Sequence, residues 1–186
     1  MKTQNNINVL VIEDNQGDYL LIKDYLEEQL QTPRIFHARR FSDAISFLNE
    51  ENTQFDVVLL DLTLPDKTGE ELITETVSLF PNIPVIVLTG YADLEFSVKS
   101  LALKASDYLL KDDINAASLF KSIQFNIERK KTTLLLEESE KRYSNLFQLS
   151  PQPMWIFDLE KYHFLQVNKA AIEHYKYTES EFLNMS

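Results

Sequence analysis

Five polar residues that could handle a metal ion and a phosphate follow apolar runs at matching places in the sequence. In chain order they are Glu13, Asp14, Asp61, Thr89 and Lys111. Three carboxylates brought together repel one another and raise their own pKa values unless a cation joins them. Oxygen ligands favour a hard ion such as Mg²⁺, and a lysine with a hydroxyl would complete a site for a phosphoryl group. The residue types therefore indicate phosphoryl chemistry at a magnesium site.

Strands that end at one edge of a sheet would bring these residues together. The stretch 57–65 is the clearest example, because four apolar residues precede Asp61 and the breakers Pro65 and Gly69 follow it. Such a run is typical of a parallel strand that is buried on both faces. Similar runs predict further strands at 8–13, 34–38, 85–88 and 107–110. At the carboxyl edge of such a sheet, where ligands bind in open α/β folds, the five side chains are expected to converge.

Helical spacing of apolar residues separates the predicted strands. The stripes are Leu21, Ile22, Tyr25, Leu26 and Leu30; Ala44, Ile45 and Leu48, with Ser42 as a possible N-cap; Leu72, Ile73, Thr76, Val77 and Phe80; Leu94, Val98, Leu101 and Ala102; and Leu119, Phe120, Ile123 and Ile127. Strands that alternate with helices five times predict an α/β fold, a doubly wound five-stranded parallel sheet with helices on both faces.

The composition argues against several classes of function. The 186 residues carry a net charge of -11 and no large lysine and arginine cluster, which disfavours nucleic-acid binding. The absence of cysteine excludes disulfides, CxxC zinc sites and a thiol nucleophile. The first apolar run, Val9 to Ile12, is too short for a signal peptide or a membrane span. We therefore expect a soluble, cytoplasmic protein that binds neither nucleic acid nor membrane.

Four blocks of the sequence resemble the response-regulator receiver domain of two-component signalling, a flavodoxin-like fold. In order they are V-L-V-I-E-D-N, L-L-D-L-T-L-P-D-K-T-G, V-I-V-L-T-G and D-Y-L-L-K-D, and the resemblance covers residues 5–128. It implies that Asp61 is the phosphoacceptor and that Asp14 binds Mg²⁺, with Glu13 assisting through water. It also implies that the carbonyl of Thr63 is a further metal ligand.

The resemblance assigns roles to the opposite side of the site as well. Thr89 and Lys111 would contact the phosphoryl oxygens, and Tyr108 falls at the aromatic switch position, although an ordinary half-buried strand tyrosine would look the same. The chain departs from the family in its Glu-Asp pair, where Asp-Asp is commoner. It also has Asp112 after the lysine, where a proline with a cis peptide is frequent. Tyr91, two residues beyond Thr89, is expected to shield the phosphate from hydrolysis.

The resemblance implies a phosphoacceptor in a two-component phosphorelay. Asp61 would take a phosphoryl group from a histidine kinase or phosphotransfer protein, so that this segment catalyses only its own phosphorylation and dephosphorylation. A haloacid-dehalogenase phosphatase would need a second aspartate where Thr63 stands, and a nucleotide site would need a glycine cluster, whereas the three glycines are dispersed. The alternative that stays open is a phosphorylation-independent docking module using the fourth helix, fifth strand and fifth helix.

The C-terminal third predicts a linker helix, 129–142, and a truncated α+β segment, 143–186. The linker could pair as a coiled coil, but Lys130, Glu137 and Lys141 interrupt its heptads, so a solvated helix is an equal alternative. From residue 142 the sequence resembles the opening of a PAS sensor domain, with strands at 154–158 and 164–167 and helices at 168–175 and 179–183. We expect a fragment that is partly disordered or packed on a partner. A homodimer through the fourth and fifth helices or the linker is a further expectation, as is an output module beyond Ser186, a histidine kinase or another enzyme.

Overall fold

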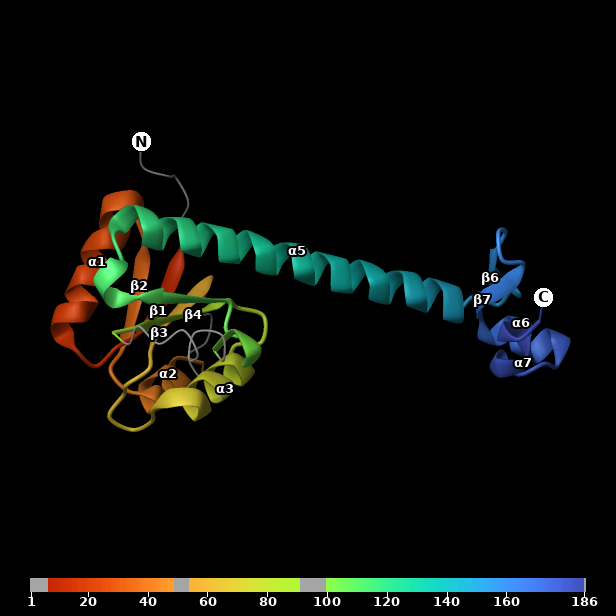
Figure 1. The fold of residues 1–186 in the computed structure, drawn as a ribbon, viewed down its shortest axis with the longest axis horizontal. Helices are drawn as coiled ribbons and strands as arrows, with labels where there is room; N and C mark the ends of the chain where they lie inside the picture. The colour runs from red at the N-terminus through yellow and green to blue at the C-terminus, as the bar shows by residue number, and fades with distance from the viewer. Residues whose placement is uncertain (1–6, 49–53, 91–99, 186) are drawn as a thin grey trace. The chain divides into compact units, whose positions relative to one another are not determined.

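The structure is a computed structural model that describes residues 7–48, 54–90 and 100–185. The chain divides into two compact units, Met1–Thr132 and Thr133–Ser186. The division falls inside one long helix, and each unit is described by itself below (Figure 1).

The first unit is built on a five-stranded parallel sheet. Its strands are β1 (Asn8–Ile12), β2 (Arg34–Ala38), β3 (Val57–Asp61), β4 (Val85–Thr89) and β5 (Asp107–Leu110). They lie in the order β2-β1-β3-β4-β5, and each neighbouring pair is parallel. This order reverses direction between β1 and β3, which is the arrangement that creates a ligand crevice at the carboxyl edge. The predicted doubly wound, flavodoxin-like fold is confirmed.

Helices cover both faces of this sheet (Figure 1). Residues of α1 (Gln16–Gln29) and α5 (Ala116–Gln148) pack with Val9 and Val11 on one face, whereas α2 (Phe41–Leu48) and α3 (Gly69–Leu79) pack with Leu10 and Ile12 on the other. Successive strand side chains point to opposite faces, so a continuous apolar run supplies both cores. The expected fourth stripe lies partly outside the described residues, which resume with helical residues 100–102.

The start of α2 differs from the prediction. The helix begins at Phe41, so Ser42 lies in its first turn and is not the N-cap. The carboxylate of Asp66 accepts hydrogen bonds from the amides of Phe41 and Ser42, both at 3.0 Å. These amides have no partner within a helix, and a carboxylate near them also meets the positive end of the helix dipole. A residue 24 positions away therefore provides the cap that was assigned to a local serine.

The connection from β5 to α5 contains no cis peptide bond, and neither does any other part of the chain that the structure describes. Lys111 to Asp113 form one 3₁₀ turn, η1. Asn115 then accepts a hydrogen bond from the amide of Ser118 at 2.9 Å, while the Ser118 hydroxyl accepts one from the amide of Asn115 at 3.0 Å. This reciprocal pair starts α5, which runs without interruption for 33 residues.

The second unit contains a two-stranded antiparallel sheet and two short helices. These are β6 (Trp155–Asp158), β7 (His163–Val167), α6 (Lys169–Tyr175) and α7 (Glu179–Leu183), close to the four predicted elements. Asn168 is fully buried between them. Its side chain accepts from the amides of Met154 and Ala171 and donates to the carbonyls of Phe147 and Gln152. One amide group thus joins the end of α5, β6 and α6. In the described part of the chain, no helix has the length and apolarity needed to cross a bilayer.

Candidate functional site

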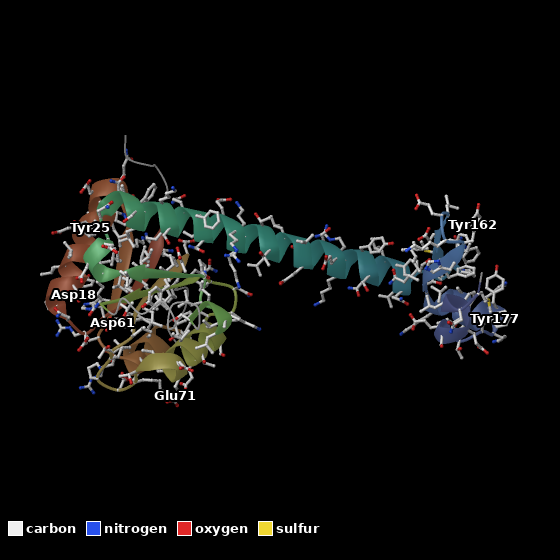
Figure 2. The ribbon with its side chains drawn as sticks, in the orientation of Figure 1. Asp18, Tyr25, Asp61, Glu71, Tyr162 and Tyr177 are labelled. Carbon is white, nitrogen blue, oxygen red and sulfur yellow. The ribbon has the colours of Figure 1, made fainter. Side chains whose placement is uncertain are left out.

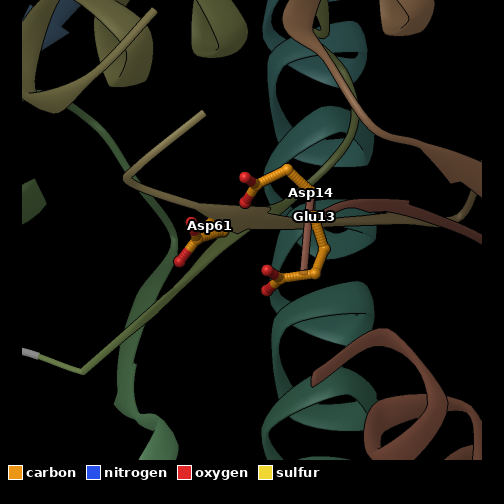
Figure 3. A group of neighbouring side chains, drawn as sticks. All are labelled: Glu13, Asp14 and Asp61. Atoms are coloured by element: carbon orange, nitrogen blue, oxygen red, sulfur yellow. The ribbon is translucent and has the colours of Figure 1, made fainter. Parts of the chain in front are cut away.

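Three carboxyl groups meet at the carboxyl edge of the first unit's sheet. Glu13 and Asp14 follow β1 directly, and Asp61 is the last residue of the adjacent strand β3. One oxygen of each lies within 4.8 Å of the others (Figure 3). Glu13 and Asp61 are buried, at 1% and 6% exposure, whereas Asp14 is exposed. The parallel register, which pairs Ile12 with Leu60, places the residues that follow these two side by side.

Lys111 lies against this cluster from the start of η1. Its ammonium group is 2.7 Å from Glu13 Oε2, 2.8 Å from Asp18 Oδ2 and 2.9 Å from Asp61 Oδ1. An ammonium group has three N–H donors, so one donor is available for each carboxylate. Figure 2 shows Asp18 and Asp61 on the same side of the first unit.

Burial shifts the acid–base properties of this group. Desolvation by burial and the charge of Asp61 outweigh the lowering effect of the Lys111 hydrogen bond, and together these effects raise the pKa of Glu13 from 4.5 to about 7. Desolvation alone would lower the pKa of Lys111, but hydrogen bonds to Asp18, Asp61 and Glu13 outweigh it and hold that pKa well above its usual value. The lysine therefore stays charged. The three carboxylates that contact it outnumber this single positive charge, which favours the binding of a further cation.

The second oxygen of Asp61 is held by the loop that follows β3. The amide of Thr63 donates to Asp61 Oδ2 at 2.9 Å. The loop closes through a bridge between Thr63 and Thr68 and through a hydrogen bond from the Gly69 amide to the Leu62 carbonyl. Gly69 has a φ of +67°, a left-handed conformation that glycine adopts without steric cost. The Asp61 carboxylate is thus oriented from both sides, by Lys111 and by Thr63.

The remaining predicted site residues lie on the neighbouring strands. Thr89 ends β4, is 1% exposed, and follows Leu88, which pairs with Asp61 in the sheet. Tyr108 is half-buried on β5 and packs against the core cluster on the α2 and α3 face. Tyr91, the expected shield of the phosphate, lies outside the described residues. The structure therefore brings Glu13, Asp14, Asp61 and Lys111 into one site, with Thr89 on the same sheet edge.

Two residues next to the site were missed by the sequence reasoning. Asp18, in the first turn of α1, contacts Lys111 but is not among the predicted site residues. His37, on β2, is the second such residue. Its Nε2 donates to the carbonyl of Glu13 at 2.8 Å, and its ring stacks on Tyr19 with centroids 3.6 Å apart. An acid in the first turn of the helix after the Glu-Asp pair was the available signal for Asp18.

A pocket lies beside this group on the side of α1. Its volume is about 280 Å³, and its lining includes Asp18, Tyr25, Leu88, Lys111 and Ile114. The pocket therefore lies between α1, the end of β4 and the turn that follows β5, and Lys111 contributes both to it and to the acidic cluster.

Comparison with solved structures finds receiver domains. A CheY-like response regulator receiver domain protein from Methanospirillum hungatei aligns with a TM-score of 0.59 at 28% identity, covering 69% of this chain and 99% of that one. The phosphorylated cyanobacterial phytochrome response regulator RcpA aligns with a TM-score of 0.55 at 26% identity, covering 69% and 96%.

Curated proteins with similar sequences are regulators of transcription. MalR of Bacillus subtilis is 36% identical over 107 residues, which are 56% of this chain and 44% of MalR. The DNA-binding regulator NtrC of Proteus hauseri is 32% identical over 105 residues, 56% of this chain and 21% of NtrC. The chain spans less than half the length of these relatives.

Family models account for most of the chain. The model of the response regulator receiver domain matches residues 9–124, and that of a PAS domain matches residues 141–185. The first match covers more than half of the sequence and coincides with the sheet and its helices. Together with the order of the strands and the acidic cluster, it shows that the chain belongs to the response-regulator receiver family, with a PAS segment after the receiver.

Proposed function

We propose that this receiver is a phosphoacceptor and that Asp61 is the nucleophile. The observation that supports this most strongly is the orientation of the Asp61 carboxylate, between the Lys111 ammonium at 2.9 Å and the Thr63 amide at 2.9 Å, at the open edge of the sheet. An oxygen of Asp61 would form a new P–O bond. The bond from phosphorus to its donor would break, with the electron pair leaving on the donor. The donor class is a phosphohistidine of a histidine kinase or phosphotransfer protein.

The donor set fits Mg²⁺. Three carboxylates within 4.8 Å, one of them exposed, match an ion that binds one or two carboxylates and keeps several waters. Asp14 and Asp61 would bind the ion, Glu13 would act through water, and the Thr63 carbonyl would add a ligand. When bound, Mg²⁺ would offset negative charge on the transferring phosphoryl group.

The protein's own groups orient the reaction and stabilise its charge. An aspartate nucleophile attacks through a carboxylate oxygen, so no general base is needed to remove a proton as from a hydroxyl nucleophile. Lys111 would supply a fixed positive charge to the phosphoryl oxygens, and the Thr89 hydroxyl a hydrogen bond. These interactions act where charge develops, beside two carboxylates that are themselves buried, Glu13 at 1% and Asp61 at 6% exposure.

The signal would leave the site through Thr89 and Tyr108. We propose that Thr89 moves toward the phosphoryl group and that Tyr108 turns inward as it does so. The change would pass to the linker, 129–142, and the PAS segment, 143–186, of a cytoplasmic signalling protein. The similar MalR and NtrC are transcriptional regulators.

Intact mass spectrometry tests the proposal. Incubation with acetyl phosphate and Mg²⁺ should add one phosphoryl group, about 80 Da. Asp61→Asn should abolish the gain, as should EDTA, whereas Asp24→Asn, which removes an exposed acid on α1, should leave it unchanged. A folded wild-type protein that gains no mass from acetyl phosphate or from a phosphorylated histidine donor would contradict the proposal. That result would favour the docking module.

A further inference from the structure

Asp18 is an acid that contacts the site without belonging to the metal cluster. It lies in the first turn of α1, and its Oδ2 is 2.8 Å from Lys111 Nζ. Glu13 and Asp61 occupy the other two N–H donors of the same ammonium group. Lys111 therefore has no donor left for a phosphoryl oxygen unless one of its three carboxylates gives way.

The three carboxylates differ in what their release would cost. The Glu13 and Asp61 side chains are 1% and 8% exposed, so an unpaired charge on either would be poorly solvated. The Asp18 side chain is 40% exposed. Water can therefore replace its contact with the lysine at little cost. Asp18 is the partner that Lys111 can exchange most readily.

We propose that Asp18 is a positioning residue. It holds the Lys111 ammonium group while Asp61 is unphosphorylated, and the phosphoryl group displaces it from that contact. This inference rests on the proposed function. An incoming phosphoryl oxygen must take the third N–H of Lys111 from Asp18, and the Asp18 carboxylate repels the same phosphoryl group. Asp18 thus slows phosphorylation of the resting protein and keeps the lysine oriented toward Asp61.

A purely structural role for Asp18 makes a different prediction. An acid in the first turn of a helix stabilises it through the helix dipole, and Asn15 already caps α1 by accepting from the amides of Gly17 and Asp18. In that case, loss of the Asp18 charge would lower the melting temperature and leave the phosphorylation rate of the folded protein unchanged.

The test measures the rate of phosphorylation by acetyl phosphate as a function of Mg²⁺ concentration. We compare wild type with Asp18→Asn, which keeps the shape of the side chain and removes its charge. Asp24→Asn is the matched control, because it removes an exposed charge from the same helix. Asp18→Glu restores the charge on a longer side chain.

The expected result is a phosphorylation rate about fivefold higher for Asp18→Asn, which corresponds to about 1 kcal/mol. The Mg²⁺ concentration at half-maximal rate should stay unchanged, because Asp18 is not a metal ligand. Asp24→Asn should match wild type, and Asp18→Glu should return the rate toward it. An unchanged or lower rate for Asp18→Asn would overturn the inference, as would an equal increase for Asp24→Asn.

The outcome also separates this inference from the proposed function. If wild type gains a phosphoryl group at Asp61 and Asp18→Asn reacts no faster, only the role of Asp18 is wrong. If wild type and both Asp18 variants gain none from acetyl phosphate or from a phosphorylated histidine donor, the proposed function is wrong and the inference falls with it.

Discussion

Replacement of Glu13 by Gln should remove a pH-dependent loss of stability from the metal-free protein. Burial, reinforced by the charge of Asp61, raises the pKa of Glu13 from 4.5 to about 7 in the folded state. Between these two values the folded protein holds a proton that the unfolded chain has released. The folded state therefore binds more protons, and the free energy of unfolding falls as the pH rises through this window. A glutamine side chain cannot titrate, so the variant lacks this contribution.

The magnitude follows from the width of the window. The interval from 4.5 to about 7, at about 1.4 kcal/mol per pH unit, amounts to about 3 kcal/mol at full ionisation. Most of it, about 2 kcal/mol, should develop between pH 5 and pH 8. The difference in the free energy of unfolding between Glu13→Gln and wild type should therefore shift by about 2 kcal/mol in favour of the variant across this range. Contributions from titrating groups that do not interact with Glu13 cancel in the difference.

Urea denaturation in EDTA at several pH values from 5 to 8 provides the measurement. Far-UV circular dichroism, combined with hydrogen exchange of the β1 and β3 amides, reports on the receiver. The single tryptophan, Trp155, lies in the second unit and does not. Saturating Mg²⁺ should flatten the wild-type curve, because a bound cation favours the ionised carboxylate. Parallel curves for wild type and variant in EDTA would refute the reasoning, since they would mean that folding leaves the pKa of Glu13 near 4.5.

Four further substitutions test the packing of the two units. Asp66→Ala should lower the free energy of unfolding by about 1 kcal/mol, because it removes the cap of α2. Ser42→Ala should lower it by less, because both backbone hydrogen bonds to Asp66 remain. Leu119→Ala, at a fully buried position of α5, should lower it by about 2 to 5 kcal/mol in urea denaturation. Asn168→Ala should destabilise the second unit by about 2 kcal/mol, measured by Trp155 fluorescence; an unchanged midpoint would show that its four hydrogen bonds are not needed.

Prediction from sequence succeeded where each decision depended on local chemistry. The strands at 34–38 and 107–110 have the predicted bounds, because short, largely apolar stretches between helical patterns have few alternatives to a strand. α5 is continuous from Ala116 to Gln148, in agreement with the absence of glycine and proline from residues 116 to 150. The second unit's strands begin within a residue of their expected positions.

Prediction failed where a distant residue replaced a local one. Ser42 is a good N-cap by type, but Asp66 reaches the start of α2 from the loop after β3. In the same way, His37 supports the Glu13 carbonyl from β2. Spacing along the chain does not predict such contacts, because they depend on which loops meet at the sheet edge.

Sequence patterns were sufficient to predict the order of strands and helices along the chain, the family, and the residues that meet at the sheet edge, Glu13, Asp14, Asp61 and Lys111. Parallel strands end at a common edge, so residue type and position were enough. The division of the three Lys111 donors among Glu13, Asp61 and Asp18 becomes visible only in the folded chain. That division depends on the direction in which α1 leaves β1 and on the turn η1 after β5, and packing sets both.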